Sequence, residues 1–427
     1  MATTANTENQ SPPVHITGTP PQDLPGYTTV ATFPPGSFLE NLAVRRDGSI
    51  LASDMLSGSI WYINPHAEDG HTQRTVELVH RFELHDAQTE GRLPGNVAEE
   101  EEAEEGHGIY SSTPAAEAII ESPTEPDLFY LFSGIHGKKG TWWVYELDMR
   151  SFIPSSNRTR TATTTSDEGE QAHQVAKVRR LAPVPTVTWL NGGTAIPHPT
   201  EPLILMAESY QGSLYSYNIK TGTVDVWLQH RLLGKMTTRP PWPGVNGVKY
   251  HHDGRDGWVY FTNSDRAILA RVRVSGHQGD PAPVAARDAR NGQVEIESLA
   301  SGCGGDDLCL DGHGNIYVAT NPHDTVLKFP RLASPDDATQ AQRGKKGEPE
   351  RQVILGLRRR QLSAEQASSP SKADSDFEVD GDTTGPTAVA FGTTASDKKD
   401  LYVVTNGGII NPFDGVVREA RVLRVHL

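Results

Sequence analysis

One pattern recurs along this chain of 427 residues and restricts its fold more than any other feature. A short apolar strand is followed by a tight turn rich in Gly, Asn or Asp, and then by another strand. Alternating apolar residues predict the strands, and the turn residues predict the breaks between them. The clearest copy is SGCGGDDLCLDGHGNIYVATNPHDTVLKF, at residues 301–329. The number of such copies therefore predicts the fold.

The second strand of this pattern occurs six times, at residues 50–54, 128–133, 203–208, 258–263, 316–320 and 401–405. Each copy continues through a turn into a third strand. Five copies follow a clear first strand, namely FLENLAV, LNGGTAI, VNGVKYH, GDDLCLD and GPTAVAF, whereas the first strand at residues 115–120 is the weakest. Repeats of four short strands are typical of propellers. We expect an all-β fold, a six-bladed β-propeller of four-stranded antiparallel sheets.

The two ends of the chain predict how the ring closes. Only His426 and Leu427 follow the last predicted strand, RVLRV, so the sixth sheet lacks an outer strand. Residues 27–33 (YTTVATF) form a strand outside the repeats and can fill that place, which removes exposed sheet edges. Two β-sandwiches are the alternative, but they explain neither the count nor the misplaced strand. We expect one propeller over residues 26–427, closed by pairing the N-terminal strand with the last blade, after a disordered segment 1–25.

The composition narrows the classes of partner. Gly 40 and Pro 30 suit a fold with many turns, and a net charge of −15 argues against nucleic acid or an anionic membrane as partner. The chain contains no apolar run long enough to span a membrane and no apolar signal-peptide core, so we expect a cytoplasmic protein that acts on small molecules. Polar insertions are predicted near residues 83–108, 152–175, 275–292, 331–350 and 360–384. The oligomeric state stays open.

The chain contains two cysteines, Cys303 and Cys309, six residues apart. Two free thiols are the simpler interpretation for a cytosolic protein. A disulfide across the intervening turn remains an alternative.

Polar residues at the entrances of the first strands define the candidate site, because these strands line the channel of a propeller. They are Glu40, Asn191, Asn246, Asp306, Asp307 and Thr387, and the ends of the second strands add Asp54, Glu208, Asn263, Asn321 and Asn406. Glu40, Asn246 and Asp306 offer the oxygen ligands that Ca²⁺ or Mg²⁺ prefers. The alternative is that these residues serve channel water and turns, since Asn-Gly is a common turn dipeptide.

Two aromatic side chains are weaker candidates near the same entrance. Trp189 faces the same side as Asn191 and could form a wall of the channel mouth, or pack in the core. His136 flanks a glycine in a loop of the second repeat and could reach the mouth.

The segments FLENLAV…SDMLSGSIWYI, LNGGTAI, NGVKY…VYFTN, GDDLCLDGHGNIYVATNP and GPTAVAF…LYVVTNGG resemble the six-bladed propellers of the SMP-30/gluconolactonase-like superfamily. They look most like its fungal branch, which includes the hetero-Diels–Alderases of tropolonic sesquiterpenoid biosynthesis. In the lactonase relatives a divalent cation is held at positions that match Glu40, Asn246 and Asp306, with Asn191 at a substrate-contacting position. The lactonase E-G-P is E-N-L here, and its P-D-G is G-D-D, which puts lactone hydrolysis in doubt.

The resemblance implies three alternative functions. The first is a hetero-Diels–Alderase of fungal secondary metabolism that joins a tropolone-derived quinone methide to a terpene. Asp306 or Glu40 would move a proton, while Asn191, Asn246, Asn321 and Asn406 would donate hydrogen bonds and Trp189 and Thr387 would contact substrate. The second is a lactone or ester hydrolase that depends on Ca²⁺ or Mg²⁺. The third is a scaffold without catalytic activity.

Overall fold

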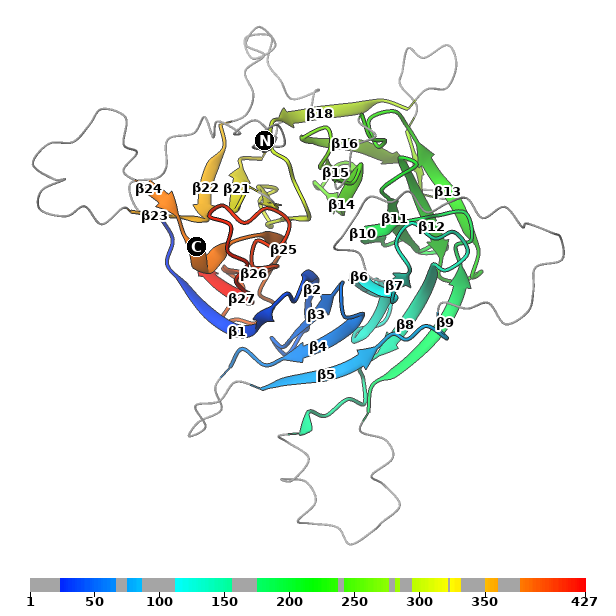
Figure 1. Ribbon diagram of the computed structural model, residues 1–427. Helices are drawn as coiled ribbons and strands as arrows, with labels where there is room; N and C mark the ends of the chain where they lie inside the picture. Colours follow the sequence, from blue (N-terminus) through cyan, green and yellow to red (C-terminus); the bar gives the residue numbers. More distant parts are fainter. Residues whose placement is uncertain are drawn as a thin grey trace, which may run out of the picture.

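The described strands form a ring of radial sheets around a central channel (Figure 1). The computed structural model describes residues 24–66, 75–86, 112–155, 175–236, 242–275, 281–284, 294–321, 323–331, 350–359 and 377–427. The predicted six-bladed β-propeller is therefore confirmed.

Each of the first three blades is a four-stranded antiparallel sheet whose strands follow the chain from the channel outwards. Blade 1 contains β2 (Leu39–Val44), β3 (Ile50–Asp54), β4 (Ser59–Ile63) and β5 (Val76–Arg81). Blade 2 contains β6 (Ala115–Glu121), β7 (Leu128–Gly134), β8 (Trp143–Asp148) and β9 (Lys177–Pro183). Blade 3 contains β10 (Leu190–Ile196), β11 (Leu203–Glu208), β12 (Ser213–Asn218) and β13 (Val224–Gln229).

The last three blades follow the same order, with additions at the outer edge. Blade 4 contains β14 (Val245–His252), β15 (Gly257–Asn263), β16 (Ile268–Ser275) and β18 (Ile296–Ser301), and the short β17 (Ala282–Pro283) also pairs with β16. Blade 5 contains β19 (Leu308–Leu310), β20 (Ile316–Thr320), β21 (Thr325–Phe329) and β22 (Gln352–Leu355). Blade 6 contains β25 (Pro386–Phe391), β26 (Asp400–Thr405), β27 (Glu419–His426) and β1 (Tyr27–Pro35).

The ring closes where the two ends of the chain pair. Strand β1 runs antiparallel to β27, from Tyr27 opposite Val425 to Pro35 opposite Glu419, and Figure 1 shows the blue strand beside the red one. The Tyr27 hydroxyl donates a hydrogen bond of 2.7 Å to Asp380, which precedes the 3-10 turn η2 (Gly381–Thr383). This confirms the predicted closure.

Apolar packing between neighbouring blades forms the core. Six buried clusters occur among the described residues, one at each contact between adjacent blades. At the closure, Phe33 of β1 packs edge-on against Trp61 of blade 1 with ring centroids 5.5 Å apart. A single sheet exposes both faces, so burial of both faces requires the complete ring.

Other sequence predictions fall partly outside the described residues. Segment 1–23 and most of each predicted insertion lie there, whereas β23 (Leu357–Arg359) and β24 (Phe377–Val379) form a two-stranded ribbon beside the gap 360–376. Cys303 and Cys309 are buried and form no disulfide bond with each other. Within the described chain, no helix combines the length and apolar character needed to cross a membrane.

Candidate functional site

Most inner strands contain a β-bulge near the end at which the strand begins. The register with the second strand shifts between Leu39 and Asn41 in β2 and between Leu190 and Gly193 in β10. Similar shifts occur in β6, β14 and β25, so five of the six inner strands are irregular at this level. A bulge redirects a side chain out of the regular alternation. Glu40, Asn191, Asn246 and Thr387 lie at these irregular positions.

The Asn-Gly pairs lie within strands rather than in turns. Asn191 and Gly192 belong to β10, and Asn246 and Gly247 belong to β14. A Cβ on Gly192 would lie 2.5 Å from the carbonyl oxygen of Asn246, so glycine is needed for close approach of two inner strands. The turn interpretation of these pairs is therefore wrong.

A pocket of about 360 Å³, including its open mouth, lies at this end of the channel. Its polar lining consists of Glu40, Asn191, Asn246, Ser264, Asp306 and Asn321. Its apolar lining consists of Phe38, Met55, Trp189, Trp242, Pro243 and Ile410. The structure thus brings together six of the eight predicted site residues, from four different blades.

Glu40 and Asp306 are both buried in the pocket, and Glu40 is the one without a hydrogen-bond donor. Its residue is 5% exposed, and no other described side chain or amide donates a hydrogen bond to its carboxyl group. Burial raises the pKa of Glu40 well above its ordinary value of 4.5, and the neighbouring Asp306, Glu117 and Asp307 raise it further. Glu40 therefore tends to keep its proton.

Asp306 lies in a more polar environment. Burial raises the pKa of Asp306 well above 3.8, but hydrogen bonds from the amides of Asn321 and Asn246 act in the opposite direction. The Asn321 Nδ2 group donates to Asp306 Oδ2 over 3.2 Å. Because donors stabilise the ionised form, Asp306 is the better base of the pair with Glu40.

Asp307 is not a lining residue of the pocket and forms a separate ionic contact. Lys249 Nζ lies 2.8 and 2.6 Å from its two carboxylate oxygens, and Asn41 Nδ2 donates to it over 2.9 Å. These contacts connect blades 1, 4 and 5. The carboxylate of Asp307 is thus compensated within the chain, unlike that of Glu40.

The donor set of the pocket fits a hard divalent cation. Asn246 Oδ1 and Asn321 Oδ1 are buried and have no hydrogen-bond partner among the described residues. With the carboxylates of Glu40 and Asp306 they provide four oxygen donors on one pocket, which is the chemistry that Ca²⁺ and Mg²⁺ require. No group of three His, Cys, Asp or Glu side chains with metal-binding geometry occurs in the described ranges. A cation here would therefore depend on the two amide oxygens.

Two predicted residues lie outside the pocket lining. The Thr387 hydroxyl donates to the carbonyl oxygens of Leu39 in blade 1 over 2.6 Å and of Val404 in blade 6 over 3.1 Å. Asn406 is fully buried, and its Oδ1 accepts a hydrogen bond from the Gly408 amide. Thr387 connects blades at the ring closure, while Asn406 organises the turn after β26.

Sequence reasoning missed several residues of the site. Trp242, Pro243 and Ile410 come from loops that carry no repeat signal. Glu117 was missed because β6 was the weakest predicted strand; a single charged residue inside the run AAEAII was its signal. His136 is not among the lining residues of the pocket, but its ring contacts the lining residue Trp189.

Neither a protein-family model nor a curated protein sequence matches the chain. Among solved structures, a luciferin-regenerating enzyme aligns over 94% of this chain and 95% of its own, with 13% identity and a TM-score of 0.53. The aldose sugar dehydrogenase of Streptomyces coelicolor aligns over 96% and 99%, with 12% identity and a TM-score of 0.45. Regucalcin, a calcium-binding protein of Agrobacterium tumefaciens, aligns over 94% and 93%, with 15% identity and a TM-score of 0.44.

The likeness to the luciferin-regenerating enzyme, with a TM-score of 0.53, concerns the class of fold. At such low identity the likeness concerns the fold alone. Any function must be argued from the pocket itself.

Proposed function

We propose that the pocket is the active site of a small-molecule enzyme that joins a tropolone-derived quinone methide to a terpene by a hetero-Diels–Alder reaction. The observation that carries this proposal is the combination of two neighbouring buried carboxylic acids, one of which receives hydrogen bonds and one of which does not, with apolar and aromatic walls in one pocket. The polar part suits an oxygenated ring, and the apolar part suits a hydrocarbon.

The two acids would have different tasks in forming the quinone methide. Protonated Glu40 donates its proton to the leaving hydroxyl of a carbinol side chain on the hydroxylated tropolone ring. Asp306 accepts the proton of the ring hydroxyl, and water leaves as the exocyclic carbon–carbon double bond forms. Glu40 ends ionised and Asp306 ends protonated, so one proton must move back between them before the next cycle. No oxidant or reductant is needed.

The cycloaddition itself needs positioning rather than a nucleophile. One carbon–carbon bond and one carbon–oxygen bond form between the heterodiene and an alkene of the terpene. Holding the partners in a reactive pose lowers the barrier by up to roughly 7–11 kcal/mol. The side chain of Asn191 lines the pocket and makes no hydrogen bond within the described chain, so its amide can donate to the heterodiene oxygen.

The test is incubation of purified protein with a hydroxymethyl tropolone precursor and a humulene-type terpene. We expect faster formation of one stereoisomer than in buffer. Glu40→Gln and Asp306→Asn should each reduce the rate by about 10²–10⁴-fold, the usual contribution of a proton-transferring group. Product formation at the buffer rate, without stereochemical preference, would exclude this reaction.

The unpartnered oxygens of Asn246 and Asn321 favour a second candidate, a cation-dependent lactone or ester hydrolase. Glu40, Asp306 and the two amides would hold the cation, and a bound Ca²⁺ or Mg²⁺ supplies polarisation of a carbonyl group and a more acidic water. In this reaction Asp306 would accept the proton of the attacking water.

A chelator separates the two candidates. Hydrolysis of a lactone or aryl ester that disappears with a chelator and returns with Ca²⁺ or Mg²⁺ would favour the second candidate. Cycloaddition that continues at full rate in chelator would favour the first. Full hydrolytic activity in chelator would exclude a cation-dependent hydrolase.

A further inference from the structure

A buried carboxylate and imidazole form a pair behind one wall of the pocket. His136 Nε2 lies 2.7 Å from Glu117 Oε1, and the two side chains are 6% and 0% exposed. Glu117 belongs to the inner strand of blade 2, and His136 follows the second strand of the same blade. Burying a Glu side chain completely is costly unless it is paired. Neither residue has a task in the reactions considered above.

The His136 ring lies between two tryptophans. Its centroid is 5.6 Å from that of Trp142 at an interplanar angle of 69°, and 4.9 Å from that of Trp189 at 83°. Both contacts are edge-to-face, the arrangement that aromatic quadrupoles favour. Trp189 is a lining residue of the pocket, so the imidazole directly supports a pocket wall.

Two hydrogen bonds to the backbone next to Trp189 also hold the aromatic side chains in place. Trp142 Nε1 donates to the carbonyl oxygen of Thr188 over 2.9 Å, and the Gly137 amide donates to the same oxygen over 3.0 Å. Thr188 immediately precedes Trp189. The loop carrying His136 and the start of blade 3 are therefore held together at the tryptophan.

We infer that Glu117 and His136 are positioning residues that fix the indole of Trp189 in the pocket wall. Glu117 orients the imidazole through its hydrogen bond, and the imidazole restricts the indole through the edge-to-face contact. The affinity of the pocket for a flat apolar ligand then depends on a carboxylate that the ligand does not touch. This inference rests on the pocket being a binding site, not on which reaction it catalyses.

The first test needs no ligand. The fluorescence emission of Trp189 is obtained by subtracting the spectrum of Trp189→Phe from that of wild type. For each variant, the spectrum of the same variant carrying Trp189→Phe is subtracted in the same way. Glu117→Leu and His136→Leu should change the intensity or wavelength of this difference spectrum, because the indole loses its fixed neighbour. Glu117→Gln keeps an acceptor for the imidazole and should stay near wild type.

The second test measures the pocket. Binding of the neutral fluorescent probe N-phenyl-1-naphthylamine should weaken about threefold to tenfold in Glu117→Leu, the size expected for loss of one oriented aromatic contact. In a Trp189→Ala background, Glu117→Leu should weaken probe binding no further, because the contact that it disturbs has already been removed with the indole. If turnover is established, KM should rise more than kcat falls.

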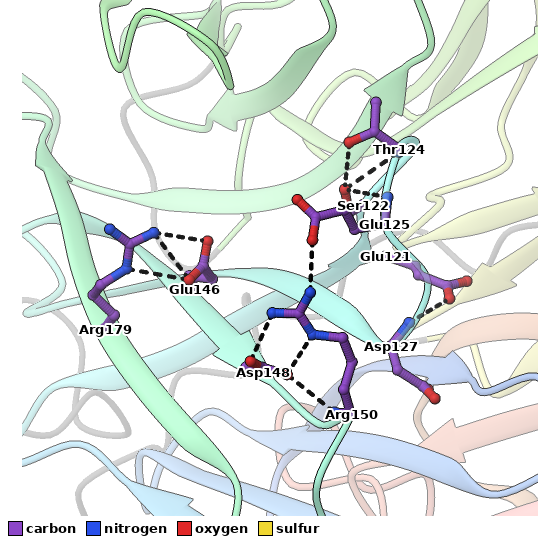
Figure 2. Close-up of polar contacts among 9 residues, drawn as sticks. All are labelled: Glu121, Ser122, Thr124, Glu125, Asp127, Glu146, Asp148, Arg150 and Arg179. Carbon is purple, nitrogen blue, oxygen red and sulfur yellow. Dashed lines mark hydrogen bonds and ion pairs between the residues drawn. The ribbon is translucent and has the colours of Figure 1, made fainter.

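Glu125 provides a matched control on the same blade. Its carboxylate lies 2.7 Å from Arg150 Nη1, the same separation as in the buried pair, but both side chains are at least half exposed. Figure 2 shows this pair together with Asp148, which also contacts the Arg150 guanidinium. Glu125→Leu should leave the Trp189 emission and the probe affinity unchanged.

The outcomes separate this inference from a purely structural role of the pair. If Glu117→Leu lowers only the free energy of unfolding while the Trp189 emission of the folded protein is unchanged, the inference is wrong. Equal effects of Glu117→Gln and Glu117→Leu, or equal weakening of probe binding with and without Trp189, would also overturn it. Failure of the cycloaddition or hydrolysis assays leaves the emission test unaffected. A wild type that does not bind the probe in any detectable amount would contradict the role in ligand affinity.

Discussion

Substituting Glu40 by Gln should make the protein more stable at neutral pH. The two side chains have nearly the same shape, so packing is retained. The carboxyl group of Glu40 is buried and receives no hydrogen bond from the described residues. The substitution therefore leaves no hydrogen-bond donor of the described chain without its acceptor. It removes a group that must lose its proton inside an acidic pocket as the pH rises.

The sign and size follow from proton linkage. The unfolded chain releases this proton near the ordinary pKa of 4.5, whereas the folded protein holds it to higher pH. Between these two pKa values the folded state binds one more proton, so the free energy of unfolding falls by about 1.4 kcal/mol per pH unit for this group. Below pH 4.5 the contribution is fully present, and above the folded pKa it is entirely lost.

Gln carries no titrating proton, so the variant lacks this slope. The difference in free energy of unfolding between Glu40→Gln and wild type should grow by about 1.4 kcal/mol per pH unit above pH 4.5, and then become constant. Asp306 raises the pKa of Glu40, and the two groups affect each other's titration. The substitution can therefore change the proton uptake of both groups, and the slope can exceed the value for one proton. The sign is unaffected.

Urea denaturation between pH 4 and pH 8 in a chelator measures this difference. Glu125→Gln is the control, because its carboxylate lies at the surface beside Arg150 and should show no such slope. Saturating Ca²⁺ should flatten the wild-type slope if the cation is held by the ionised carboxylates. A wild type whose stability in chelator rises with pH relative to Glu40→Gln would refute the reasoning.

Three further substitutions test the ring and the pocket. Phe33→Ala removes a buried ring at the closure, so urea denaturation should show a loss of about 3–5 kcal/mol. Lys249→Met leaves the carboxylate of Asp307 buried without its cation, and the same assay should show a loss of about 3 kcal/mol, at the low end because Lys249 is 25% exposed. Adding Asp307→Asn should recover part of this loss. Ile410→Trp places a larger side chain in the pocket, so probe binding should weaken at least tenfold. The free energy of unfolding should change by less than about 1 kcal/mol, because Ile410 is only partly buried. Unchanged binding would exclude Ile410 from the occupied part of the pocket.

The regular strands were predictable because their signals are local. Alternating apolar residues placed β3, β11 and β20 at the bounds that the structure shows. The partner of β1 was predictable for a different reason: a sheet without an outer strand and a strand without a sheet must complete each other, and β1 does pair with β27.

The candidate site was predictable only where strand entrances signal it. Glu40, Asn191 and Asn246 stand at the start of strongly patterned strands, so the radial geometry alone brings them together. Thr387 has the same sequence position in β25, and β25 bulges as β2, β10 and β14 do. Its hydroxyl nevertheless donates to the carbonyl oxygens of Leu39 and Val404. Which group a side chain at a bulge meets depends on the neighbouring strands, and the sequence pattern does not contain that information.

The sequence by itself determined the number of blades, the order of their strands and the pairing of the two ends, because these follow from periodicity and from the need to satisfy every sheet edge. Only the tertiary structure decided that Glu117 and His136 meet behind Trp189, that Ile410 lines the pocket, and which acid lacks hydrogen bonds. The physical reason is that pKa values and pocket walls depend on burial and on atoms a few ångströms away, which come from different blades.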